Sequence, residues 1–190
     1  MLLRLIVALS LLAFGTTAMA GTLDLNVWNS SAQVQYGTSM GRNALGKSEL
    51  HFGALYSDSN NSNNTLVDFG IVVKDEVGSI APGFSAGVGI KGLAAHVQGT
   101  NDSAVTLGGL IRYSPADLPR MGIVGQLYFA PKITTFGHAN RYVETGIQVE
   151  YEVIPNAAAY IGYRNIKFNL NDGSTAMLDE GAFVGVRMSF

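Results

Sequence analysis

Apolar and polar residues alternate with a period of two along most of the chain, in short segments separated by turn-forming residues. The segment with the clearest alternation, 142–153, carries Glu144, Glu150 and Glu152 on one face and apolar residues on the other. The last segment, 179–190, alternates in the same way and ends on Phe190. Successive side chains of a β-strand point to opposite faces, so this period is that of strands. The pattern predicts an all-β protein.

Ten such segments follow one another, and no stretch has a comparable helical pattern. They span 23–28, 32–36, 49–56, 67–73, 84–91, 105–113, 121–130, 142–153, 159–164 and 179–190. The connection Ile154-Pro155-Asn156 is so short that the chain must turn straight back. We therefore predict an antiparallel up-and-down β-barrel of ten strands. The alternative is eight strands, from about Glu49 onward, preceded by an N-terminal segment.

The closing segment 179–190 suits a transmembrane barrel of the bacterial outer membrane, where a strand shows its apolar face to lipid and its mixed face to the lumen. In such barrels both chain ends lie on the periplasmic side. We then expect periplasmic turns at 75–82, 114–120 and 154–156, and outer loops at 57–64, 96–102, 131–140 and 169–178. Another connection is expected at 37–47. The C-terminal Phe190 is the expected membrane-assembly signal, through which the barrel-assembly machinery would recognise the closing strand.

The first 20 residues have the features of a secretory signal peptide. Arg4 precedes an apolar run, and Ala18-Met19-Ala20 precedes Gly21 as a cleavage site does. The apolar run is shorter than the roughly 20 residues that a spanning helix needs. We predict a cleaved signal at 1–20 and a single barrel domain at 21–190, exported to the cell outer membrane.

Composition narrows the function classes. Without Arg4, 11 basic residues remain against 14 acidic ones, so the mature chain has a formal charge of −3 and no basic surface for nucleic acid. Charged residues make up only 14% of the chain, against about 25% in soluble domains. The chain has no Cys, which excludes disulfides and thiolate metal sites. We expect no cofactor and no metal, and outer-membrane lipid as the surroundings; the oligomeric state stays open.

Several polar and charged residues fall on the face opposite the apolar stripe, and Phe183 accompanies them. They are Asp68, Lys91, Arg112, Gln126, Glu144, Gln148, Glu150, Arg164 and Arg187. Arg or Lys facing lipid near the bilayer midplane costs about 2–4 kcal/mol, so the lumen is the better place. A lumen of eight to ten strands is scarcely wider than its side chains. We expect a network of ion pairs that plugs the barrel, with a narrow polar pathway as the alternative.

Four passages resemble the YfaZ family of small bacterial outer-membrane β-barrel proteins. They are 127–134 (LYFAPKIT), 150–153 (EYEV), 160–166 (YIGYRNI) and 185–190 (GVRMSF). The resemblance implies an outer-membrane β-barrel with a structural or narrow porin-like role. It implies no catalytic residue.

A lipid-modifying enzyme of the outer membrane is a different class of function, and it would need a nucleophile and a base in hydrogen-bond reach. The three histidines are His51, on a lumen face, and His96 and His138, near outer loops. None has Ser at a diagnostic spacing, so no catalytic residue is predicted. A soluble periplasmic β-barrel that binds a small apolar ligand is the alternative for location.

Overall fold

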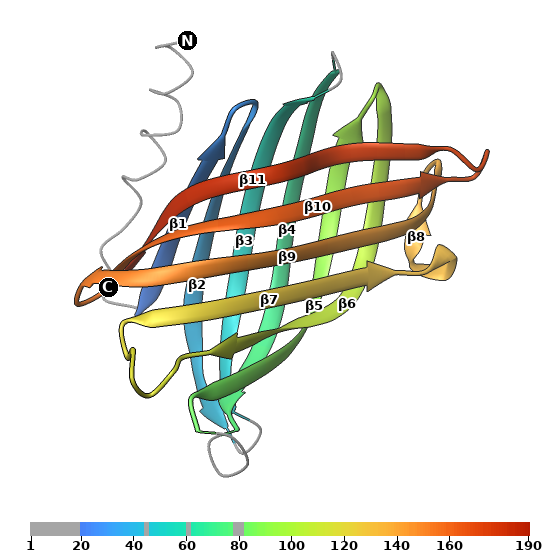
Figure 1. Ribbon diagram of the computed structural model, residues 1–190. Coiled ribbons are helices and arrows are strands. Elements are labelled where there is room, and N and C mark those ends of the chain that lie inside the picture. Colours follow the sequence, from blue (N-terminus) through green and yellow to red (C-terminus); the bar gives the residue numbers. More distant parts are fainter. Residues whose placement is uncertain (1–19, 44–45, 60–61, 78–81) are drawn as a thin grey trace.

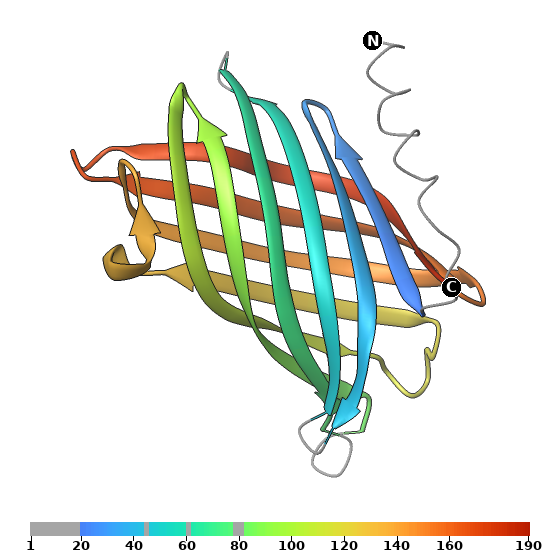
Figure 2. The same cartoon turned by 180° about the vertical axis from the view of Figure 1, so that it is seen from behind.

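The computed structural model describes residues 20–43, 46–59, 62–77 and 82–190, and over these ranges the chain forms a closed antiparallel β-barrel of ten long strands. The strands β7 and β9–β11 pass across one side of the barrel, and β1–β6 form the other side at a steep angle to them (Figures 1 and 2). Barrel strands tilt by about 35–45° from the axis, so opposite walls cross. Apart from Ala20, the predicted signal lies outside the described residues. No helix in these ranges has the length and apolarity needed to cross a membrane.

The ten long strands account for most of the described chain. They are β1 (Gly21–Trp28), β2 (Ser31–Asn43), β3 (Gly46–Ser59), β4 (Ser62–Glu76), β5 (Phe84–Val97), β6 (Thr100–Tyr113), β7 (Met121–Ala130), β9 (Ala139–Ile154), β10 (Ala157–Leu170) and β11 (Thr175–Ser189). The 3-10 turn η2 (Lys132–Thr134) and the short strand β8 (Thr135–Phe136) lie between β7 and β9.

The N-terminal hairpin is part of the barrel wall. Strand β1 pairs with β2 on one side and with β11 on the other, where Leu25 lies opposite Val186. Each remaining long strand pairs with the next long strand along the chain, including β5 with β6 and β7 with β9. The ten-strand prediction is confirmed, and the eight-strand alternative is wrong because its N-terminal segment forms the closing pair.

Burial alternates along the strands as the sequence pattern predicts. In β4, Leu66, Asp68 and Val72 are buried, whereas the intervening Val67 and Phe69 are exposed. Phe69 shows 61% of its surface although it lies in mid-strand. A sheet that covers polar residues and exposes large apolar ones is the inverse of a water-soluble core. Its outward face suits an apolar solvent.

Both chain ends of the barrel lie at one end, here called the proximal end, where the backbone N–H groups of Gly21 and Phe190 each donate to the other's carbonyl at 2.8 and 2.9 Å. The opposite end is called the distal end. Because consecutive strands are antiparallel, the end of β4, the start of β5 and the connections 114–120 and 155–156 lie at the proximal end. The connections at 29–30, 98–99, 131–138 and 171–174 lie at the distal end.

The predicted lengths of four connections are wrong. The segment 57–64 is mostly strand, with Ser57 paired to Asn64, and the segments 96–102 and 169–178 also continue the ladders. The segment 37–47 is strand to Asn43 and again from Gly46. Polar side chains do not stop a ladder, because backbone groups make its hydrogen bonds. The inward Ser57 and Asn64 also find partners across the lumen, in Asp179 and the carbonyl of Leu178.

Candidate functional site: the lumen

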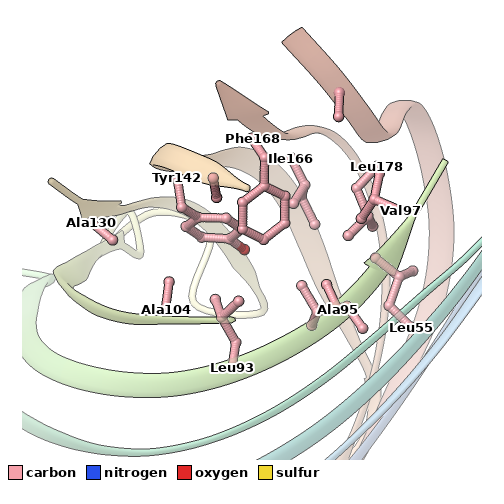
Figure 3. Close-up of a cluster of buried hydrophobic side chains, with 13 residues drawn as sticks. Leu55, Leu93, Ala95, Val97, Ala104, Ala130, Tyr142, Ile166, Phe168 and Leu178 are labelled. Carbon is pink, nitrogen blue, oxygen red and sulfur yellow. The ribbon is translucent and has the colours of Figure 1, made fainter. Parts of the chain in front are cut away.

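An apolar cluster fills the distal part of the lumen, and we call it the distal plug. Its two largest members are Tyr142 and Phe168, whose ring centroids lie 4.9 Å apart and which are both 0% exposed (Figure 3). The other members are Leu55, Leu66, Leu93, Ala95, Val97, Ala104, Ala130, Ala139, Ile166, Ala176 and Leu178. The plug is thus built by β3–β7 and β9–β11, which are eight of the ten long strands, and no separate segment forms it.

The plug arises because the inward face of several strands changes from polar to apolar towards the distal end. Strand β5 continues from Lys91 to Leu93, Ala95 and Val97, and β10 continues from Arg164 to Ile166 and Phe168. The alternation of the sequence does not predict this change. The available signal was weak: where both faces are apolar, as in Leu93-Ala94-Ala95, the period of two disappears.

On the proximal side of the distal plug, the buried carboxylate of Glu144 accepts hydrogen bonds from three side chains. The Oε2 atom of Glu144 accepts from the ammonium of Lys91 at 2.6 Å and from the hydroxyl of Tyr142 at 2.8 Å. Its Oε1 atom accepts from Gln126 at 3.2 Å. The ammonium also lies 4.0 Å from the ring centroid of Tyr128. Glu144 and Lys91 are almost fully buried, and a charge removed from water is tolerated when it is paired and hydrogen-bonded in this way.

A second cluster centres on Arg164, which joins β10 to three other strands. Its Nε donates to Asp179 at 2.5 Å, and its Nη1 donates to Asn26 at 2.7 Å and to Gln33 at 2.5 Å. Its Nη2 donates to Ser31 at 3.3 Å. Arg164 is 4% exposed. The planar guanidinium suits this role because it presents five donors in a fixed fork.

The third cluster, nearer the proximal end, has two cations and two carboxylates. Arg187 donates to Asp24 and to Glu150, at 2.8 Å in each case, and Glu150 also pairs with Arg112. Tyr160 donates to Asp24. The formal charges of this cluster balance.

Exposure rises from the distal to the proximal end of the lumen. Plug side chains such as Tyr142 and Phe168 are fully buried, whereas the side chains of Lys74, Arg112 and Arg187 are 30%, 41% and 29% exposed. The lumen is therefore closed by packed side chains at the distal end and accessible to solvent from the proximal end.

All nine predicted lumen residues face inward, and Asp68 is buried on the inward face of β4. The three clusters bring seven of the other eight into ion pairs or hydrogen bonds: Lys91, Gln126, Glu144, Arg164, Arg112, Glu150 and Arg187. The eighth, Gln148, lies at 3.5 Å from Glu150. Phe183 is also inward, with the guanidinium of Arg164 5.2 Å from its ring centroid. The terminal Phe190 is exposed at the proximal end and stacks on Tyr36.

The three histidines have different surroundings, and His138 is exposed in the distal connection, where its backbone N–H donates to Asp102 at 2.7 Å. His51 faces the lumen, 3.5 Å from Glu49. His96 lies on the outer wall, with Nδ1 2.8 Å from Oδ1 of Asn101, in a depression of about 480 Å³ that Ser103 and Phe136 also line. Ser103 makes no hydrogen bond to His96 within the described residues. Nor do three His, Asp or Glu side chains come together as metal ligands in the described part of the chain.

Comparison with known proteins gives one family and a few solved structures. The model of a family described as "YfaZ precursor" matches residues 1–190. No curated protein matches the chain. The outer membrane channel DcaP of Acinetobacter baumannii is similar with a TM-score of 0.47 and 10% identity, over 89% of this chain and 62% of that chain. The KdgM porin is similar with a TM-score of 0.46 and 14% identity, over 90% and 99%. The chain thus spans less than two thirds of the DcaP chain, and at these scores neither likeness says anything about activity.

Proposed function

The chain belongs to the YfaZ family of small bacterial outer-membrane β-barrel proteins, and we propose that it is a closed, non-enzymatic barrel of the outer membrane, structural rather than conducting. The proximal end then faces the periplasm and the distal end faces outward. The lumen then opens only to the periplasm and ends at the distal plug.

The distal plug carries this proposal. A channel needs a continuous hydrated path, but here fully buried Tyr142, Phe168 and Leu178 close the lumen where it would open to the outside. The cavities between such apolar side chains stay dry, because water needs two to four polar partners. An ion would also have to break the pair between Lys91 and Glu144 beneath the plug.

The outward face supports the membrane location. Mid-strand residues such as Phe69, Ile71 and Leu107 are 61%, 47% and 66% exposed. Contiguous exposed apolar surface of this kind is unstable in water and is what a lipid-facing barrel wall requires.

Planar-bilayer recording tests closure. Purified wild-type protein is expected to give no discrete conductance steps above background, while a general porin in the same bilayers gives steps. Regular steps from the wild-type protein, scaling with salt concentration, would establish the narrow porin-like role and refute closure.

Membrane location is tested by extraction. We expect the protein to stay with outer-membrane fragments after osmotic shock and to need detergent for release. Release by osmotic shock alone would indicate the soluble periplasmic barrel instead.

One observation favours the second candidate, a lipid-modifying enzyme. The depression on the outer wall holds a base, His96, oriented by Asn101, together with the hydroxyl of Ser103. The hydroxyl of Ser103 does not donate to His96 within the described residues, although acyl transfer needs such a hydrogen bond between nucleophile and base. In some enzymes this hydrogen bond forms only when the substrate binds. Overexpression followed by analysis of lipid A and phospholipid acylation tests this candidate. Products that change with the wild type and not with Ser103→Ala would establish it.

A further inference from the structure

Three cations lie near the distal edge of the wall built by β7, β9 and β10. Lys132 is exposed in η2, Arg141 is exposed near the start of β9, and Lys167 is half-buried near the end of β10. We call Lys132, Arg141 and Lys167 the distal cations. They are not part of the lumen clusters.

The strand register places two of them side by side on the outside of the barrel. Arg141 lies opposite Asn169, and Lys167 lies opposite Val143. Between them, Tyr142 and Phe168 form an opposed pair that points into the lumen. Neighbouring positions along a strand face opposite ways, so Arg141 and Lys167 share the outward face. As diagonal neighbours their Cβ atoms are about 7–8 Å apart.

The distal cations lack the acidic partners that the lumen cations have. Among the described residues, no carboxylate lies within 4.0 Å of Lys132, Arg141 or Lys167. Arg141 instead lies over the ring of Phe129, 5.8 Å from its centroid.

Three acids of the described chain near this edge have other partners, and one of them, Asp102, accepts from the backbone N–H groups of His138 and Ala139 at 2.7 and 2.8 Å. Ser174 donates to Asp172 through its hydroxyl at 2.7 Å and its backbone N–H at 2.9 Å, which lowers the pKa of that carboxyl. Glu180 accepts from Tyr163 at 2.9 Å.

Their height on the wall places these cations at the membrane boundary. Arg141 is two residues from the start of β9 and Lys167 three residues from the end of β10, so they lie within about 10 Å of the distal edge at 3.3 Å per residue. Below Arg141 the outward face becomes apolar at Val143 and Phe129, and below Lys167 it passes through Asn165 to Tyr163. Cations are costly at the bilayer midplane but cost only about 0–1 kcal/mol near the interface.

We propose that Arg141 and Lys167, with Lys132 at the edge, bind the phosphate groups of a phosphorylated glycolipid in the outer leaflet. Unpaired outward cations directly above an apolar wall complement a ligand whose anionic head lies directly above its acyl chains. The guanidinium can bind a phosphate in bidentate fashion, and the lysine adds a second charge. The proposal rests on the outer-membrane location proposed above.

Titration of the purified barrel, in neutral detergent micelles, with lipid A tests this site. Native mass spectrometry counts bound lipid for the wild type, for Arg141→Gln with Lys167→Gln, and for Arg120→Gln. Arg120 is a matched control, because it is an exposed cation at the proximal end without an ion pair in the described chain. Each cation near an anionic lipid contributes about fivefold in affinity, so the double variant should bind about 25-fold more weakly.

The control should bind as the wild type does, and dephosphorylated lipid should bind no better to the wild type than to the double variant. Unchanged lipid A binding by the double variant overturns the proposal, as does an equal loss in Arg120→Gln. Displacement by inorganic phosphate at concentrations comparable to the lipid would indicate a small-anion site and also overturns it. If the double variant does not fold, the two single variants, each expected to lose about fivefold, decide the question. Lipid binding in micelles does not depend on where the protein lies in the cell. A negative binding result is therefore distinguishable from a negative result of the extraction test.

Discussion

Removal of Arg164 should destabilise the barrel far more than removal of an exposed cation. In Arg164→Met, Asp179 keeps only the hydroxyl of Ser57, at 3.1 Å, although it is 7% exposed. Asn26 loses the donor to its Oδ1 atom. Breaking one partner out of a buried ion pair costs about 3–5 kcal/mol, because the remaining charge stays buried and uncompensated. An exposed pair such as Arg42 with Asp75 contributes about 0–1 kcal/mol.

The free energy of unfolding can be measured by urea titration of the folded protein in lipid vesicles, followed by the emission of Trp28, the only Trp in the chain. We expect a loss of about 3–5 kcal/mol for Arg164→Met and at most about 1 kcal/mol for the control Arg42→Met. The double variant Arg164→Met with Asp179→Asn should recover about half of the loss, because it removes the unpaired charge. A loss below about 1 kcal/mol, or a double variant no more stable than the single one, would refute the reasoning.

Two further substitutions probe packing in the lumen. Phe168→Ala should cost about 3–5 kcal/mol by opening a cavity in the distal plug, whereas Ala at Ile133, which is 86% exposed, should change stability by about 0.5 kcal/mol or less. If Phe168→Ala lowered the free energy of unfolding by less than Ile133→Ala does, the plug would not be tightly packed. Gly185→Val should cost about 1–3 kcal/mol, because a Cβ at Gly185 would meet the ring of Tyr160 and the carbonyl of Leu25. Gly125→Ala, which meets only Ile111 at 3.5 Å, is its control, and equal urea midpoints for the two variants would contradict the contact.

The sequence was sufficient to predict the barrel and its strand count because a lipid-facing wall forces strict alternation. Wherever an inward residue is polar, as from Glu144 to Glu150, the period of two is unambiguous. The inward facing of Arg164 and Arg187 followed from the same alternation and from the cost of a charge in lipid.

The distal plug could not be predicted in this way. At Leu93 the neighbours Gly92 and Ala94 are also apolar or small, so the pattern no longer distinguishes lumen from lipid. At Ile166 the alternation is inverted, because the inward residue is apolar and its outward neighbours Asn165 and Lys167 are polar. The partners of each charge could not be predicted from the sequence either. Ser31 and Gln33 precede Arg164 by more than 130 residues, and barrel closure alone brings them into contact with it. Polar composition also predicts longer loops than the barrel has, because polar residues such as Ser57 and Asn64 form part of a strand ladder.

The central claim, a lumen closed at its outer end and open to the periplasm, is tested most directly by cysteine labelling. The chain has no Cys, so single cysteines are unique probes. Val124 faces the lumen between Arg112 and Gln148, and Ser174 lies exposed in the distal connection. With a membrane-impermeant sulfonated maleimide dye, we expect Ser174→Cys to react in intact cells and Val124→Cys to react only after the periplasm is opened. Labelling of Val124→Cys in intact cells at the rate of Ser174→Cys would contradict a lumen closed by the distal plug.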